Sequence, residues 1–157
     1  MARRYGWGFK SSRVVSHVPF GHWKTSTFVA SLRVTGLTAP LVTDGPMTGE
    51  IFLASIEQLL LPTLRPGDVM VMDNLSSHKQ PRVRELIESV GAHLLYLPPY
   101  SPDLNPIELA FSKLKCLLRK SAERTVSDLW RRIGLLLNEF TPRECRNYFE
   151  HCGYHAD

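Results

Sequence analysis

The sequence has few cysteines and no long apolar run. Its 157 residues include only three cysteines, Cys116, Cys145 and Cys152. So small and odd a set argues against a disulfide framework and favours reduced thiols in the cytosol. No apolar stretch approaches the roughly 20 residues that a membrane-spanning helix needs. No apolar segment follows the basic N-terminus either, as one would in a secretory signal. We therefore expect a cytoplasmic protein with no membrane partner.

The sequence also lacks internal repeats, low-complexity segments and an interdomain linker. Its length suits one domain with a sizeable core, so we expect residues 1–157 to form a single domain with no separate DNA-binding domain. The formal net charge of +4 is mildly basic. A basic excess of this size is compatible with nucleic acid but is also common in proteins that never bind it.

Residue patterning predicts an α/β fold. Alternating and β-branched residues predict a strand over 25–34 that turns at Gly36 and pairs with a strand over 39–43. A helix is expected from a cap at Thr48 to a stop at Pro62. The same signals predict strands over 69–72 and 93–97, and helices over 80–90, 106–121, 126–139 and beyond residue 142. A hairpin followed by alternating helices and strands predicts a layered α/β domain with a mixed sheet.

Asp73 and Glu108 are acids in settings typical of catalytic carboxylates. The apolar run 69–72 ends at Asp73, which places this acid at the carboxyl end of a strand, where α/β sheets bind ligands. Glu108 lies on the expected first turn of a later helix, and 34 residues separate the two acids (108 − 73 − 1 = 34). Proteins bind Mg²⁺ through a few carboxylates, water and substrate phosphate oxygens. The pair therefore suits metal-assisted phosphoryl chemistry.

Both acids also have structural explanations. Asp73-Asn74 after a strand can be turn chemistry. Asn105 is a good N-cap and Pro106 suits the first helical position, which would make Glu108 a capping-box acid.

Two other chemistries are weaker interpretations. The run Ser76-Ser77-His78 does not predict a hydrolase, because adjacent residues in one turn do not form a serine–histidine relay. A zinc site is disfavoured because its candidate ligands lack a CxxC pair; these are Cys145, His151, Cys152 and His155.

Two strings decide between these alternatives. Residues 72–78, Met-Asp-Asn-Leu-Ser-Ser-His, and residues 97–108, Leu-Pro-Pro-Tyr-Ser-Pro-Asp-Leu-Asn-Pro-Ile-Glu, resemble the catalytic core of the mariner-like superfamily of DDE transposases, in its bacterial insertion-sequence branch. The resemblance extends from about residue 21 to 154. It implies a ribonuclease H-like fold, two Mg²⁺ ions (Mn²⁺ as substitute) held by three acids, and cleavage and joining of DNA at transposon ends and target. It makes Asp73 the second acid and Glu108 the third.

The chain departs from this family at the first acid. Residues 1–24 contain no aspartate or glutamate, and Asp44 follows the wrong strand. We therefore expect an N-terminally truncated catalytic domain that lacks the first strand and does not cut DNA efficiently alone. Its expected partners are DNA and either a second copy or an upstream transposase fragment, at the nucleoid of a bacterium. The alternatives are a non-catalytic remnant that binds DNA or a sister subunit, and a metal-dependent nuclease unrelated to transposition.

Basic residues near the acids predict a DNA-binding surface. Glu108, Ser112, Lys115 and Arg119 follow at steps of four, three and four residues, so they share one helix face. The alternative for any single cation is a solvated basic face. The residues expected to contact DNA phosphates are Lys24, His78, Lys79, Lys113, Lys115, Arg119 and Lys120, with Arg124 just beyond.

Overall fold

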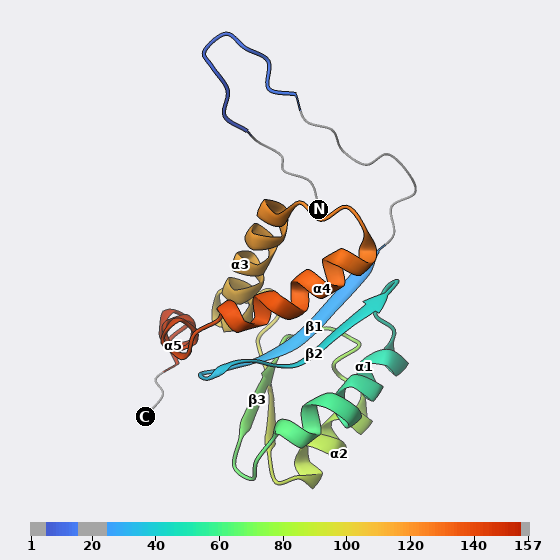
Figure 1. Cartoon of the computed structure of the whole chain (residues 1–157). Coiled ribbons are helices and arrows are strands. Elements are labelled where there is room, and N and C mark those ends of the chain that lie inside the picture. The colour runs from blue at the N-terminus through green and yellow to red at the C-terminus, as the bar shows by residue number, and fades with distance from the viewer. Residues whose placement is uncertain (1–5, 16–24, 155–157) are drawn as a thin grey trace.

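The computed structural model describes residues 6–15 and 25–154. The body of the fold begins with an antiparallel hairpin of β1 (Ser26–Arg33) and β2 (Gly36–Asp44), as the alternating pattern predicts. Its register shifts between Val29 and Ser31, which marks a bulge. No residue of β1 is fully buried. In Figure 1 the hairpin crosses the middle of the molecule, with α4 on one side and α1 on the other.

A second, parallel pair is formed by β3 (Val69–Met72) and β4 (His93–Tyr96). The crossover between them carries α2 (Pro81–Ser89), which buries Val83 and Ile87. Parallel strands require such a crossover, usually a helix. Both strands and the helix lie within one or two residues of the ranges that the sequence predicts.

The segment between the hairpin and β3 is helical, but it is not one regular helix. The Thr48 hydroxyl accepts the amide hydrogen of Ile51 at 3.2 Å and caps α1 (Gly49–Ser55), as predicted. The segment continues as a π-helical turn (Ile56–Leu60) and a 3₁₀ turn (Leu61–Thr63) that holds Pro62. Patterning alone does not reveal such turns, because the apolar spacing of the α and π forms is similar over five residues.

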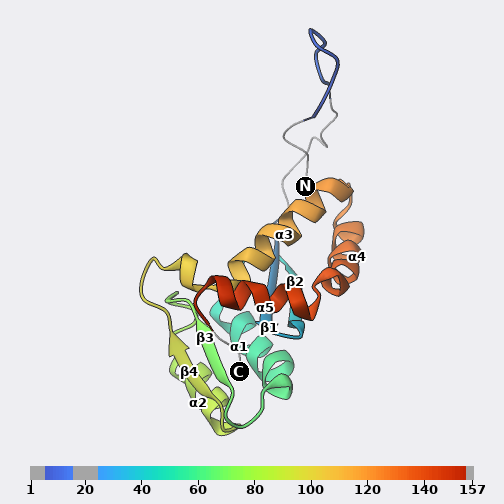
Figure 2. The ribbon, with the colours of Figure 1, turned by 90° about the vertical axis from the view of Figure 1, so that its left-hand side faces the viewer.

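Three helices complete the chain. α3 (Pro106–Ser121) is the longest and has the predicted bounds. α4 (Val126–Leu136) begins at the Thr125 cap and ends in a 3₁₀ turn, and α5 (Pro142–His151) begins at the Thr141 cap. Figure 2 shows α5 lying across the face of the molecule, beside α3. No helix among the described residues is long and apolar enough to cross a bilayer.

The fold has two apolar cores. One joins α1, its π turn, α2 and the β3–β4 pair, around Phe52, Ile87 and Leu94. The other joins α3, α4 and α5 to the hairpin, around Ala110 and Leu114. The strands form two separate two-stranded sheets, and β1 is not hydrogen bonded to β3. The predicted α/β class is confirmed. The described strands, however, do not join into one continuous sheet.

Candidate functional site

Asp73 follows the last residue of β3, where the chain leaves the sheet. The amide of Leu97 donates to the carbonyl of Met72 at 2.8 Å and extends the parallel pairing to the strand end. The amide of Leu75 approaches Asp73 Oδ1 at 3.4 Å, which is long for a hydrogen bond. The carboxylate is 40% exposed. The turn interpretation therefore accounts for little of the environment of Asp73.

His78 holds the Asp73 carboxylate from the other side. Its Nδ1 atom lies 2.5 Å from Asp73 Oδ1, without hydrogen-bond geometry. The imidazole stacks on the ring of Phe52, with centroids 4.4 Å apart and an interplanar angle of 26°. The Tyr96 hydroxyl donates to the His78 carbonyl at 2.8 Å and fixes the backbone. With its side chain only 20% exposed, His78 faces Asp73 rather than open solvent.

Glu108 lies on the first turn of α3, and its carboxylate is not used as a cap. Asn105 occupies the N-cap, but its side chain makes no capping hydrogen bond. The amide of Glu108 instead donates to the Asn105 backbone carbonyl at 3.1 Å. Glu108 is exposed, and its carboxylate has no hydrogen bond or ion pair with any described residue. The capping-box interpretation is therefore wrong, and Glu108 is available for chemistry.

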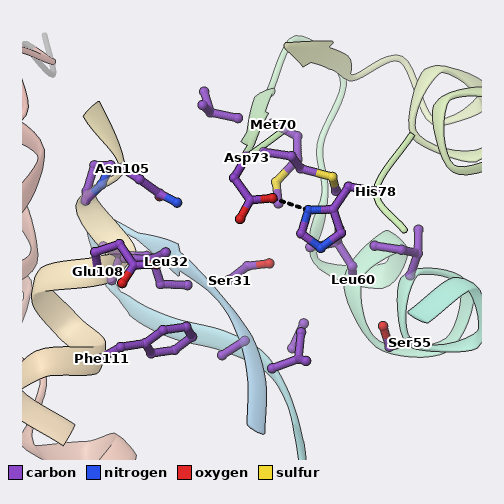
Figure 3. Close-up of a pocket in the computed structure, with 18 of the residues that line it drawn as sticks. Ser31, Leu32, Ser55, Leu60, Met70, Asp73, His78, Asn105, Glu108 and Phe111 are labelled. Atoms are coloured by element: carbon purple, nitrogen blue, oxygen red, sulfur yellow. Dashed lines mark ion pairs between the residues drawn. The ribbon is translucent and has the colours of Figure 1, made fainter. Parts of the chain in front are cut away.

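The two acids border the same space. Asp73, Asn105 and Glu108 line both a cavity of about 320 Å³ between the two sheets and an adjoining cavity of about 380 Å³ under the 97–102 loop. Figure 3 shows Glu108 on the α3 side and Asp73 on the β3 side of the first cavity, with Ser31 of β1 between them. The strand-end acid and the helix-start acid thus border one cavity from opposite sides.

The donor atoms fit a hard divalent cation. Carboxylate and amide oxygens are the ligands that Mg²⁺ prefers. Beside the two acids, the side-chain oxygen of Asn74 is buried without a hydrogen-bond partner among the described residues. Within residues 6–15 and 25–154, no three His, Cys, Asp or Glu side chains gather into a metal cluster. The described members of the zinc alternative, Cys145, His151 and Cys152, thus do not form such a group.

The predicted DNA-contacting residues have different environments. Lys79, Lys115 and Arg119 are exposed, and Lys115 and Arg119 share the solvent face of α3 with Glu108 and Ser112. Lys120 is exposed at the end of the same helix and Arg124 just beyond it. Lys24 lies outside the described residues.

Lys113 faces α5 and is held within the fold. Its ammonium pairs with Glu144 at 2.5 Å, donates to the Glu139 carbonyl at 2.7 Å and sits 4.7 Å from the ring centroid of Phe140. Burial raises the pKa of Glu144, but hydrogen bonds from Lys113 and Tyr148 outweigh it and hold that pKa below its usual value.

Three residues that line or support the site have contacts or conformations that the sequence does not predict. Phe52 stacks on His78 from a helix 26 positions earlier (78 − 52 = 26), a contact that no local pattern reveals. Asn74 is adjacent to Asp73, where local sequence predicts a turn residue and gives no sign of a buried side-chain oxygen. Tyr100 is fully exposed at the rim of the second cavity, with a φ of 57° in the left-handed region. The Pro-Pro-Tyr-Ser-Pro run marks a constrained loop, but it does not give this conformation.

The sequence matches the profile of a family described as DDE superfamily endonuclease over residues 1–129, most of the chain. The chain belongs to the DDE superfamily endonuclease family. The predicted resemblance is therefore confirmed at the level of the family. No curated protein is significantly similar to this DDE family member in sequence.

Solved structures of the Mos1 transposase share the fold. The Mos1 catalytic domain with raltegravir and Mg has a TM-score of 0.66 at 16% identity, covering 83% of this chain and 78% of that one. The Mos1 mariner paired-end complex with Mn has a TM-score of 0.70 at 13% identity. The match covers 98% of this chain and 47% of that one. The pre-cleavage Mos1 transpososome has a TM-score of 0.69 at 14% identity. The match covers 100% of this chain and 53% of that one. The DDE chain thus spans about half the length of the Mos1 chains in the latter two. These likenesses confirm the predicted ribonuclease H-like α/β fold.

Proposed function

We propose that this chain carries part of a DNA transposase active site, with Asp73 and Glu108 as two of its catalytic acids. The observation that carries the proposal is the placement of both carboxylates on one cavity, from the carboxyl end of β3 and the first turn of α3. Membership of the DDE endonuclease family supports phosphoryl transfer on DNA, and structures of the Mos1 relative with Mg and with Mn support the use of a divalent ion.

The site residues have separate roles in this proposal. Asp73 and Glu108 would hold Mg²⁺, or Mn²⁺ in its place, with the Asn74 amide oxygen as an additional donor. Bound there, the ion would supply Lewis-acid stabilisation of charge on the phosphate and lower the pKa of an attacking water or hydroxyl. His78 keeps the Asp73 carboxylate oriented from its place on Phe52. No serine, cysteine or histidine nucleophile is required.

Duplex DNA is the proposed partner. The exposed cations Lys115 and Arg119 lie on the α3 face that starts at Glu108, so a strand held along this face would bring its phosphates toward the acids. Such contacts position DNA without reading its sequence. Relatives with this fold are described as paired-end and strand-transfer complexes, which supports transposon ends as the substrate and a second copy as a partner.

Cleavage of supercoiled DNA in Mg²⁺ tests the proposal. The chain should nick slowly by itself, because misplaced groups in phosphoryl transfer can cost about 10²-fold. A fusion that adds an N-terminal strand ending in aspartate should cut faster, and Asp73→Ala or Glu108→Gln should abolish the gain. Glu57→Gln, an exposed helical glutamate away from the cavity, is the matched control.

The outcomes separate the alternatives. Nicking that survives Asp73→Ala would overturn the assignment of the acids. DNA binding without Mg²⁺-dependent cleavage, even in the fused chain, would identify a non-catalytic DNA-binding remnant instead. Fast nicking by the 157-residue chain, abolished by Asp73→Ala, would confirm the acids and overturn the expectation that a further acid is required.

A further inference from the structure

Asn105 shares the space between the two acids. Among the described residues, the polar side chains that line both cavities are Asp73, Asn105 and Glu108. Figure 3 shows the Asn105 side chain on the α3 side of the first cavity, beside Glu108 and across from Asp73. Its amide group makes no hydrogen bond with any described residue. An amide left free beside two carboxylates is available to a ligand.

The capping role that sequence suggests for Asn105 is unused. Asparagine is among the best N-cap residues, and replacing a used cap by alanine lowers stability. The threonines that cap α1, α4 and α5 each accept a backbone amide hydrogen with the side chain; they are Thr48, Thr125 and Thr141. Asn105 has the extended backbone of an N-cap, with φ −111° and ψ 99°, yet its side chain caps nothing. Helix capping therefore does not account for an asparagine at this position.

The backbone of Asn105 is held in place although its side chain is free. Its amide donates to the Pro102 carbonyl at 3.0 Å, after the short 3₁₀ turn Pro102–Leu104. The Tyr154 hydroxyl donates to the carbonyl of Leu104, the preceding residue, at 2.9 Å. Pro106 follows, and its ring fixes its own φ. A group that positions a substrate acts best from a rigid backbone, because less freedom is lost when the ligand binds.

An amide suits a phosphate at this place better than a cation would. A lysine or arginine between Asp73 and Glu108 would pair with the carboxylates and compete with the metal ion that we assign to them. The asparagine amide is uncharged, so its N–H groups can donate to a phosphate oxygen and leave both carboxylates free. Side-chain amides are among the usual donors to DNA phosphates. The chemistry of the site thus favours a phosphate oxygen as the partner of Asn105.

We propose that Asn105 is a phosphate-binding residue, whose side-chain amide donates a hydrogen bond to an oxygen of the DNA phosphate held at Asp73 and Glu108. This inference rests on the proposed function and adds a third polar group to its site. Lys115 and Arg119 attract the strand as a whole, whereas Asn105 orients one phosphate at the acids. Because the amide carries no charge, its contact releases no counterion and does not depend on salt.

DNA binding by the full chain in Mg²⁺ tests the proposal. The probe is a short fluorescent duplex, and its affinity is measured by anisotropy over a series of salt concentrations. Asn105→Ala should bind at least about tenfold more weakly at every salt concentration, as expected for a lost hydrogen bond to a charged oxygen. The slope of log K against log salt should stay that of wild type. Lys115→Ala with Arg119→Ala should change the slope instead, so the two kinds of contact are separable.

Further variants separate the donor from side-chain size and charge. Asn105→Gln keeps the amide and should lose less affinity than Asn105→Ala. Asn105→Asp keeps the shape and a capping oxygen but has no donor, so it should lose at least as much as Asn105→Ala. Asn138→Asp, at an exposed position that lines neither cavity, adds the same charge and is the control. In EDTA wild type and Asn105→Ala should bind equally, because without the ion the two carboxylates repel phosphate.

Stability and metal binding distinguish the other roles that Asn105 could have. Asn105→Ala should leave the melting temperature unchanged, whereas Thr141→Ala, which removes a used cap, should lower it by about 2–4 °C. Mn²⁺ affinity, measured by calorimetry, should also be unchanged in Asn105→Ala, because the amide binds phosphate and not the ion. Both measurements are independent of cleavage and of DNA.

Equal DNA affinities of wild type and Asn105→Ala in Mg²⁺ would overturn the inference. A fall in melting temperature as large as that of Thr141→Ala would overturn it as well and identify Asn105 as a helix cap. A loss of Mn²⁺ affinity in Asn105→Ala would identify a metal ligand instead. Failure of the proposed function has a different sign, which is absence of Mg²⁺-dependent cleavage by the fused chain.

Discussion

The Asp73 carboxylate and the His78 imidazole face each other at 2.5 Å, and the imidazole in turn stacks on Phe52. This arrangement links the end of β3 to α1 through one side chain. It leaves Asp73 40% exposed toward the cavity that Glu108 also borders. The histidine thereby gives the acid a fixed orientation without enclosing it.

The first prediction concerns His78. His78→Phe should keep the ring stack on Phe52, so the melting temperature should change little. Loss of the contact to Asp73 should weaken Mn²⁺ binding by about 10–100-fold, the usual effect of removing a group that orients a metal ligand. Isothermal titration calorimetry measures the affinity. His93→Phe, at an exposed position that starts β4, is the control. Unchanged Mn²⁺ affinity in His78→Phe would show that the contact has no part in the site.

The second prediction concerns Lys113, which we expect to stabilise the fold rather than bind DNA. Lys113→Met keeps the alkyl stem over Phe140 and removes the ion pair with Glu144. Unfolding in urea at pH 7 should show that the free energy of unfolding falls by about 1.5–3 kcal/mol, the range for hydrogen bonds to charged groups. Lys115→Met, on the exposed face, should cost much less.

The third prediction is the pH dependence of that loss. The pKa of Glu144 is lowered in the folded chain, so its paired carboxylate stabilises the fold above the unfolded value, near 4.5. This stabilisation is lost as the pH falls through the folded pKa. The difference in free energy of unfolding between wild type and Lys113→Met should therefore be largest at pH 6–7 and shrink below about pH 4.5. A difference that stays constant down to pH 3 would mean that packing over Phe140, and not charge, is what Lys113 contributes.

The fourth prediction concerns DNA. If about four phosphates are neutralised, log K should fall against log salt with a slope near −3.6. Lys115→Ala with Arg119→Ala should flatten this slope by about two units and leave the fold intact, because both side chains are exposed. Arg143→Ala with Arg146→Ala removes the same charge from the exposed face of α5 and is the matched control. Equal slopes in the two double variants would place DNA elsewhere on the surface.

Local features of the fold were predictable from sequence. The α3 bounds, the Thr48 cap and the short β3 strand all follow from signals within a few residues. The π turn at Ile56–Leu60 and the unused cap at Asn105 did not follow, because packing against other elements decides them. Sequence patterns also do not show that Lys113 is paired within the fold while Lys115 is exposed. Only the fold brings Glu144, 31 positions away, to one of them.

The site was predictable to a similar extent. Strand-end and helix-start positions were enough to place Asp73 and Glu108 on one cavity. Phe52 and Tyr96, which contact His78 beside Asp73, come from other elements and required the structure. The separation of the strands into two sheets was equally hidden, since strand patterns say which residues pair but not which edges stay unpaired.

Mn²⁺ binding by a double-mutant cycle tests the central claim most directly. Wild type, Asp73→Asn, Glu108→Gln and the double variant are titrated with Mn²⁺, and free ion is followed by electron paramagnetic resonance, with Glu57→Gln as the control. If the two acids form one site, each single variant should lose at least about tenfold in affinity. The double variant should then lose much less than the sum of the two effects, since residues in one network are not additive. Wild type at about 100 times its dissociation constant should also gain roughly 2.7 kcal/mol in its free energy of unfolding. At the same Mn²⁺ concentration each single variant, because it binds at least about tenfold more weakly, should gain clearly less. Binding by Glu108→Gln equal to wild type, or strictly additive losses, would contradict a shared metal site.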